Sequence, residues 1–145
     1  MEIKLKRVHT TKDLIISACI VAAGIGLFFL NKGLGCVVFA CGMLMQLIYK
    51  GGYKREGEEI ILIKKAPEVA RSCYDSLKDY LDGKDVEPVF KNADGTGMIR
   101  LEVYYNAEAT VAYAQLFTFS NYSYVEETPI VELRGPRAEK LIRLL

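Results

Sequence analysis

Two long apolar runs without a charged residue stand back to back near the start of the chain. The first covers residues 14–30 and the second residues 34–49, and only residues 31–33 separate them. A helix that crosses a bilayer needs about 20 mostly apolar residues, with a lower bound near 17. Each run is close to that bound and can be extended by interfacial residues. The pattern predicts a transmembrane helical hairpin with helices at about residues 14–31 and 34–50.

Two other interpretations account less well for these runs. A hairpin buried in a soluble protein would also be apolar, but core helices of this length usually carry a polar face, and neither run has one. A cleaved secretory signal would explain the basic start and the first run. It leaves the second run unexplained, and no small-x-small cleavage motif stands between the first run and Lys32. The membrane hairpin accounts for both runs and is favoured.

Basic residues on either side of the runs predict the orientation of the hairpin. Four precede the first run and three follow the second, whereas the loop has Lys32 alone; the seven are Lys4, Lys6, Arg7, Lys12, Lys50, Lys54 and Arg55. The positive-inside rule then places both termini in the cytoplasm. We expect an integral protein of the bacterial inner (cytoplasmic) membrane, with a basic tail at residues 1–12, the hairpin at residues 13–50 and a cytoplasmic domain at residues 54–145.

Small residues recur at helical spacing inside both runs. They are Ala18, Ala22 and Gly26 in the first run and Cys36 and Ala40 in the second. Such residues let helix backbones approach closely. They predict packing of the two helices on each other, and a homo-oligomer formed through the exposed side of the hairpin is the open alternative. Because no Asp, Glu, Lys, Arg or His lies in the middle of either run, we expect an anchor and not a transporter.

The remaining residues alternate between strand and helix patterns. The predicted elements are strands at residues 59–64, 86–90, 98–105, 110–120 and 129–133, and helices at residues 67–81 and 136–145. Residues 98–105 alternate most regularly, while both helices carry apolar stripes at helical spacing. We expect an α+β domain in the order β-α-β-β-β-β-α, with a mostly antiparallel sheet and helices on one of its faces.

Composition argues against several functional classes. A net charge of +1 over 145 residues disfavours a nucleic-acid binder driven by bulk charge. One histidine, His9, and four cysteines without a C-x-x-C motif make no zinc pattern. The Gly-rich residues 94–97 precede a strand and predict a turn, not a phosphate loop. Since no catalytic triad or paired carboxylates are visible, we expect no enzyme, no cofactor and no metal.

Two groups of residues are candidates for binding. Aromatic side chains crowd the predicted central hairpin, and Tyr104, Tyr113, Tyr122 and Tyr124 are the candidates for contact with a protein partner. Packing within the sheet is the alternative for them. Basic residues recur every three positions near the C-terminus, and Arg134, Arg137, Lys140 and Arg143 are the candidates for contact with anionic lipid. A solvated helix face is the alternative here.

These observations favour a membrane-anchored protein-interaction module, such as a regulatory subunit or an immunity-type protein. The alternative is an anionic-lipid-facing module that uses its basic C-terminal helix, and an enzyme with a dispersed site ranks last. The expected partners are the lipid bilayer, a protein of unknown identity and, through the hairpin, a further copy of the chain. We expect no nucleic acid among them.

The junction between the second apolar run and the next strand carries a resemblance. Tyr53, Glu58 and the segment EIILIK at residues 59–64 are similar in plan to the start of bacterial membrane-anchored PH-like domains. That resemblance implies a barrel in which several strands follow. Residues 67–81 predict a helix instead, so the chain is not assigned to that family.

Overall fold

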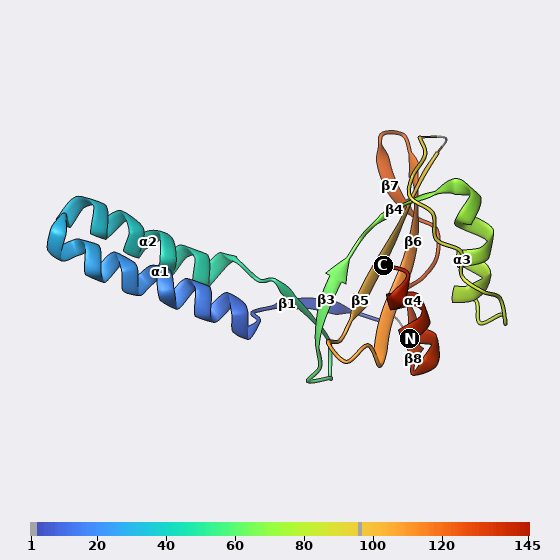
Figure 1. Cartoon of the computed structure of the whole chain (residues 1–145), viewed down its shortest axis with the longest axis horizontal. Coiled ribbons are helices and arrows are strands. Elements are labelled where there is room, and N and C mark those ends of the chain that lie inside the picture. Colours follow the sequence, from blue (N-terminus) through green and yellow to red (C-terminus); the bar gives the residue numbers. More distant parts are fainter. Residues whose placement is uncertain (1–2, 96) are drawn as a thin grey trace. The chain divides into compact units, whose positions relative to one another are not determined.

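The computed structural model describes residues 3–95 and 97–145, and these divide into two compact units (Figure 1). One unit contains Leu5–Ile61 and the other contains Leu62–Leu145. Residues 1 and 2 of the predicted tail and Thr96 of the predicted turn lie outside the described residues. Within those residues the chain is α+β, with antiparallel strands and four α-helices, which confirms the α+β class and the antiparallel sheet of the prediction.

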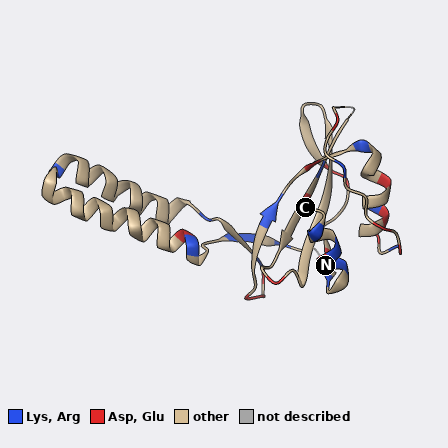
Figure 2. Cartoon of the chain, viewed as in Figure 1, with Lys and Arg blue, Asp and Glu red and all other residues tan. Residues whose placement is uncertain are grey.

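The first unit is dominated by two apolar helices, α1 (Thr11–Leu30) and α2 (Lys32–Ile48), which lie side by side and are joined by the single residue Asn31. Asn31 ends α1 and caps α2, since its side-chain oxygen accepts a hydrogen bond from the backbone N–H of Leu34 at 3.1 Å. Figure 2 shows charged residues only near the ends of the pair. α1 is long and apolar enough to cross a membrane, whereas α2 is apolar but has 17 residues.

Glycines bring the backbones of the two helices together. Gly24 and Gly35 are buried where α1 faces α2. A Cβ atom on Gly24 would lie 2.5 Å from the backbone nitrogen of Phe39, and one on Gly35 would lie 2.4 Å from the backbone of Phe28. Both distances are far below van der Waals contact, so neither site accepts a side chain without separating the helices.

The predicted packing stripe is wrong. Its members, Ala18, Ala22, Gly26, Cys36 and Ala40, are all exposed, and a Cβ atom on Gly26 would meet nothing within 4 Å. The residues buried between the helices are instead Ser17, Gly24, Gly35 and Gly42. They stand seven apart on each helix, because two helices that cross at a shallow angle return to the same contact face every two turns.

Asp13 ties the two ends of the helical hairpin together. Its carboxylate accepts hydrogen bonds from the backbone N–H of Thr10 at 2.9 Å and of Gly51 at 2.8 Å. The Thr10 hydroxyl in turn accepts from the Asp13 N–H, which completes a capping box at the start of α1. The carboxylate therefore caps α1 and holds the segment that follows α2.

The chain enters and leaves this helix pair as paired strands. β1 (Leu5–Val8) runs antiparallel to β2 (Gly52–Arg55), with Leu5 opposite Arg55 and Val8 opposite Gly52. Residues 5–8 of the predicted tail thus form a strand. Four residues with two adjacent charges are too short to reveal a strand by alternation, so only the pairing defines it.

The second unit is built on two long antiparallel strands, β5 (Met98–Tyr105) and β6 (Val111–Ser120). Two short strands pair in succession with β5, namely β3 (Ile61–Lys65) and β4 (Glu68–Ala70), and two pair with β6, namely β7 (Ser123–Glu126) and β8 (Val131–Arg134). Pro67 and Pro129 stand between the members of each short pair. Proline donates no ladder hydrogen bond, which is consistent with its place at these interruptions.

Helices cover one face of this sheet, as predicted. α3 (Tyr74–Leu81), which follows the 3-10 turn Arg71–Cys73, and α4 (Pro136–Arg143) contribute buried residues to the same core as the central strands. The members of this core include Val69, Leu77, Tyr80, Ile99, Leu101, Val103, Leu116 and Leu141. The two helices are also bonded to each other, since the Tyr80 hydroxyl donates to the Arg137 carbonyl at 2.7 Å.

Two predicted elements of this unit differ from the structure, and one strand was not predicted. The helix expected at residues 67–81 begins late, because Glu68–Ala70 is β4 and pairs with β5. The strand expected at residues 86–90 is absent from the described residues, where Val89 donates its N–H to the Ser76 hydroxyl at 2.8 Å. β7 was not expected at all. Contacts with residues more distant in sequence decide the first two cases, whereas β7 pairs with β6 across a two-residue turn.

The glycine contacts predict how substitutions change the helix pair. Gly35→Leu is expected to lower the free energy of unfolding by about 2–3 kcal/mol, because the side chain overpacks the Phe28 backbone. Gly26→Ala is the matched control and is expected to leave it unchanged or raise it by up to about 1 kcal/mol, since its surroundings are open. Far-UV circular dichroism of the full-length chain unfolded in detergent micelles measures both; equal losses would contradict the packing described.

Candidate functional site

The sheet face opposite the helices carries a buried carboxylate, Glu102, which is 6% exposed. Its two oxygens lie 2.8 Å from the Lys64 Nζ atom and 3.0 Å from an Arg100 guanidinium nitrogen. The Tyr104 hydroxyl donates to it at 2.9 Å. We call these four residues the Glu102 cluster. Two cations around one buried anion explain how a carboxylate is accommodated inside the sheet.

The alternation of β5 places these residues on one face. Arg100, Glu102 and Tyr104 follow each other at every second position, so they share the face opposite Ile99 and Leu101, which lie in the core. Lys64 reaches the cluster from β3, where it stands directly opposite Tyr104. The alternation was visible in the sequence, whereas the position of Lys64 beside the cluster could be known only from the register between β3 and β5.

The cluster alters the acidity of its members. Burial acts to raise the pKa of Glu102, but hydrogen bonds from Lys64 and Tyr104 and the charges of Lys64 and Arg100 outweigh it and lower that pKa. Burial likewise acts to lower the pKa of Lys64, and the hydrogen bond to Glu102 reverses the sign and raises it. Burial raises the pKa of Tyr104. All three shifts favour a charged Glu102–Lys64 pair beside a neutral tyrosine at neutral pH.

Arg100 also belongs to an aromatic stack. Its guanidinium lies 4.1 Å from the ring centroid of Tyr124 and 5.3 Å from that of Phe117. The Tyr124 hydroxyl donates to Glu68 at 2.7 Å. Residues of β4, β5, β6 and β7 are thus joined through one arginine. A guanidinium group suits such a site because it is planar and weakly hydrated and can stack on aromatic rings.

The four candidate tyrosines do not form one surface. Tyr104 is 9% exposed and Tyr113 is fully buried, so neither offers surface to a partner, which corrects that part of the prediction. Tyr124 is half-buried by the stack on Arg100. Tyr122 is 97% exposed. Alternation along a strand shows which residues share a face of the sheet. Whether those residues are buried depends on what packs over that face, and the sequence did not show this.

Tyr122 occupies an unusual place at the turn between β6 and β7. Asn121 and Tyr122 form the two-residue connection, with φ angles of 50° and 60°. Two positive φ values are those of a type I′ turn, whose second position is normally glycine. A bulky residue there is an outlier. Phe119 and Val125, close to the turn, are also exposed, and the rings of Phe119 and Tyr124 meet edge to face at 5.2 Å. We call Phe119, Tyr122, Tyr124 and Val125 the hairpin tip.

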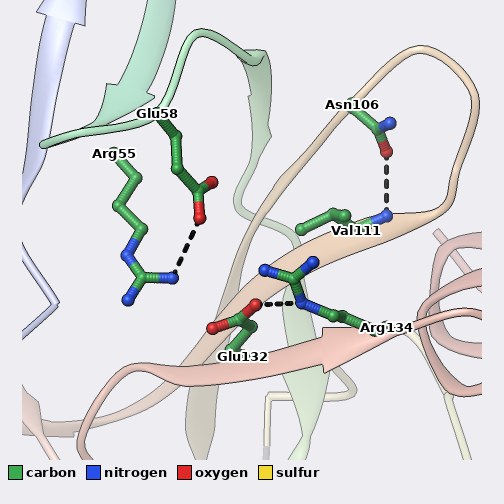
Figure 3. Close-up of polar contacts among 6 residues, drawn as sticks. All are labelled: Arg55, Glu58, Asn106, Val111, Glu132 and Arg134. Carbon is green, nitrogen blue, oxygen red and sulfur yellow. Dashed lines mark hydrogen bonds and ion pairs between the residues drawn. The ribbon is translucent and has the colours of Figure 1, made fainter.

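The four basic candidates near the C-terminus each have a partner within the protein. Arg134 pairs with Glu132, as Figure 3 shows, and Arg143 pairs with Glu139. Lys140 pairs with Glu87, while Arg137 donates to the backbone carbonyl of Tyr80. Arg137 therefore joins α4 to α3. All four residues thus have a partner in the folded chain, and their contact with anionic lipid stays a prediction.

Asn106, which the sequence did not single out, organises the turn between β5 and β6. Its buried side-chain oxygen accepts a hydrogen bond from the N–H of Val111 at 2.9 Å, drawn in Figure 3, and a second one from the N–H of Thr110 at 3.0 Å. Its amide nitrogen donates to Glu108 and Thr110. The side chain thus satisfies a turn in which Ala109 has a φ of 56°, and we assign it a structural role.

The comparisons with known proteins add no family to this description: no protein-family model, curated protein or solved structure matches the chain. Within residues 3–95 and 97–145, no group of three or more His, Cys, Asp and Glu side chains is placed to hold a metal ion.

Glu102 is expected to make stability depend on pH. Glu102→Gln leaves Lys64 and Arg100 without their shared anion and should lower the free energy of unfolding by about 2 kcal/mol at pH 7, less than for a fully buried pair because both cations are partly exposed. A lowered folded-state pKa contributes stability above the unfolded value, and that contribution is lost as the pH falls through the folded value.

The difference in the free energy of unfolding between wild type and Glu102→Gln should therefore have its maximum value above about pH 5 and decrease on further acidification. Urea unfolding followed by near-UV circular dichroism of the tyrosines measures it at each pH. Glu126→Gln, an exposed carboxylate of β7, is the control and should change little. A difference that grows on acidification would overturn this assignment.

Proposed function

We propose that the chain is a membrane-anchored protein-interaction module, in which α1 and α2 form a transmembrane anchor and the hairpin tip contacts another protein. A regulatory subunit or an immunity-type protein fits this role. The proposal has two parts that are tested separately. The first concerns the solvent around the helices, and the second concerns the surface that meets the partner.

The outer surface of the helix pair supports the membrane part. Large apolar side chains cover it, including Phe29 at 84% exposure and Leu30 at 86%, with Val37, Leu47 and Ile48 also exposed. Soluble monomers rarely expose apolar patches of more than a few hundred Å². In hydrocarbon such side chains are the expected covering, and the interior contact is made by glycines, as membrane helices prefer. Cytoplasmic termini follow from the positive-inside rule.

Three cysteines test this part directly. Cys19, Cys36 and Cys41 are exposed on the helices, so water would reach them if the pair stood in solution. In intact membrane vesicles we expect a membrane-impermeant maleimide to leave all three unlabelled, because hydrocarbon covers them. Denaturation in sodium dodecyl sulfate should then expose all four cysteines, including the buried Cys73. Rapid labelling of the helix cysteines in vesicles would rule out a transmembrane pair.

A single observation carries the interaction part: Tyr122 is almost fully exposed at a backbone position that disfavours it. A left-handed conformation costs a side-chain-bearing residue about 1–2 kcal/mol relative to glycine. Strain of this kind persists where surrounding structure or function maintains it, and an observed outlier is a sound starting point for a functional hypothesis. Tyrosine is also among the residues that dominate binding energy at protein interfaces.

Tyr122→Gly separates folding from binding. Glycine relieves the left-handed strain, so the variant should be about 1 kcal/mol more stable than wild type in urea unfolding. The same change removes the exposed ring and should abolish contact with the partner. A photo-crosslinking amino acid at position 125 of the full-length protein, in its native membranes, reports that contact as one discrete cross-linked protein band.

The control for this experiment is Val89, which is about as exposed as Val125 and lies outside the hairpin tip. Val89→Ala should leave the cross-linked band intact, and a crosslinker placed at position 89 should not yield it. Persistence of the band in Tyr122→Gly, or its appearance from position 89, would reject the hairpin tip as the binding surface.

A further inference from the structure

A pocket of about 240 Å³ lies where the end of α3 meets the start of α4. Its lining includes three basic side chains, Lys84, Arg137 and Lys140, and one carboxylate, Asp85, with Tyr80 as its aromatic wall. The basic residues come from two segments that are distant in sequence. Their approach is a product of the fold, since the sequence alone showed only the spacing of Arg137 and Lys140 along one helix.

Arg137 is held in place before any ligand arrives. Its guanidinium lies 4.8 Å from the Tyr80 ring centroid and donates to the Tyr80 carbonyl, while the Tyr80 hydroxyl donates back to the Arg137 carbonyl at 2.7 Å. This arrangement caps the carboxyl end of α3. A guanidinium has five N–H donors in a rigid fork, so one carbonyl does not exhaust it. Gly83, at a φ of 91°, leaves room beside it.

The two lysines have partners that a ligand can replace. Lys84 Nζ lies 2.5 Å from Asp79, and Lys140 pairs with Glu87, whose side chain is 78% exposed. Ion pairs between solvated side chains contribute little to stability. A doubly charged anion in the pocket would therefore compete with each carboxylate at small cost, whereas the buried Glu102–Lys64 pair has no such freedom.

The start of α4 adds a fixed positive potential. Gly135 is the residue that precedes the helix, and it has no side chain to cap the first N–H groups. Pro136, the first helical residue, lines the pocket. The amino end of a helix carries a partial positive charge and favours a nearby anion.

We propose that this pocket binds a phosphate group, which Arg137 orients through its planar fork while Lys84 and Lys140 neutralise the charge. A soluble phosphate ester and a phospholipid with a terminal phosphate present the same chemistry, and the pocket accommodates either headgroup. The site is separate from the hairpin tip and does not depend on the proposed protein partner.

Thermal unfolding of the full-length protein in non-ionic detergent tests the site. One arm adds inorganic phosphate and the other adds dihexanoyl phosphatidic acid, each at constant ionic strength against chloride. A ligand that binds only the folded state raises the melting temperature, and the rise grows with the logarithm of the ligand concentration above its dissociation constant. A shift with phosphate alone identifies a soluble ligand, and a shift with phosphatidic acid alone identifies a lipid headgroup; both results support the site.

Matched variants show whether the shift comes from the pocket. Lys84→Gln combined with Lys140→Gln should weaken phosphate affinity by roughly tenfold, because two charge-assisted contacts are removed. Arg143 lies on the same helix but does not line the pocket, so the Arg143→Gln variant should retain the full shift in melting temperature. Phosphate also stabilises proteins by exclusion from their surface, an effect that every variant would keep. No shift in either arm, an undiminished shift in the double variant, or an equal loss in Arg143→Gln would overturn the site.

Discussion

The pairing of β5 with β6 is the interaction on which the unit Leu62–Leu145 depends. Seven residue pairs join the two strands, from Ile99 opposite Thr118 to Tyr105 opposite Ala112. Every other described strand of the unit pairs with one of them. One face of this pair supplies the core beneath α3 and α4, and the opposite face supplies the Glu102 cluster. A register shift of one residue would exchange these faces, so the buried leucines and the buried carboxylate are fixed by the same pairing.

The sequence predicted elements well where periodicity is long and local. Residues 98–105 alternate strictly and are β5, and the apolar stripe before the C-terminus is α4. Prediction failed where a short segment takes its structure from a distant partner. Glu68–Ala70 has a helical pattern but pairs with Met98–Arg100, because three ladder contacts with a central strand outweigh a weak helical preference. β7 has only four residues and offers no period to detect.

The candidate sites show the same division. Alternation on β5 placed Arg100, Glu102 and Tyr104 together, but Lys64 enters the cluster through the register of β3. Small residues at four-residue spacing predicted the wrong contact face for the helices, because a pair of antiparallel helices repeats its contacts every seven residues and selects glycines for backbone approach. Tyr122 is exposed because it lies in the two-residue turn between β6 and β7. A tyrosine at the second position of such a turn, where glycine is usual, is unusual and is visible in the sequence, but the prediction from sequence did not use it.

Charge pairs in this protein differ in what they can do, because burial decides whether a partner can be exchanged. Glu102 is enclosed by Lys64 and Arg100, and removing it leaves two cations in a partly desolvated place. The pairs beside α4 are solvated, and each loses little when a lysine turns from a carboxylate to another anion. Burial therefore distinguishes structural from binding roles. The buried charges of the sheet hold strands together, whereas the exposed lysines of the α3–α4 pocket can bind a ligand. The same reasoning separates the three basic residues of α4 from one another. Arg137 is held in place by α3 and keeps N–H donors for a ligand, whereas Lys84 and Lys140 can exchange a carboxylate for one.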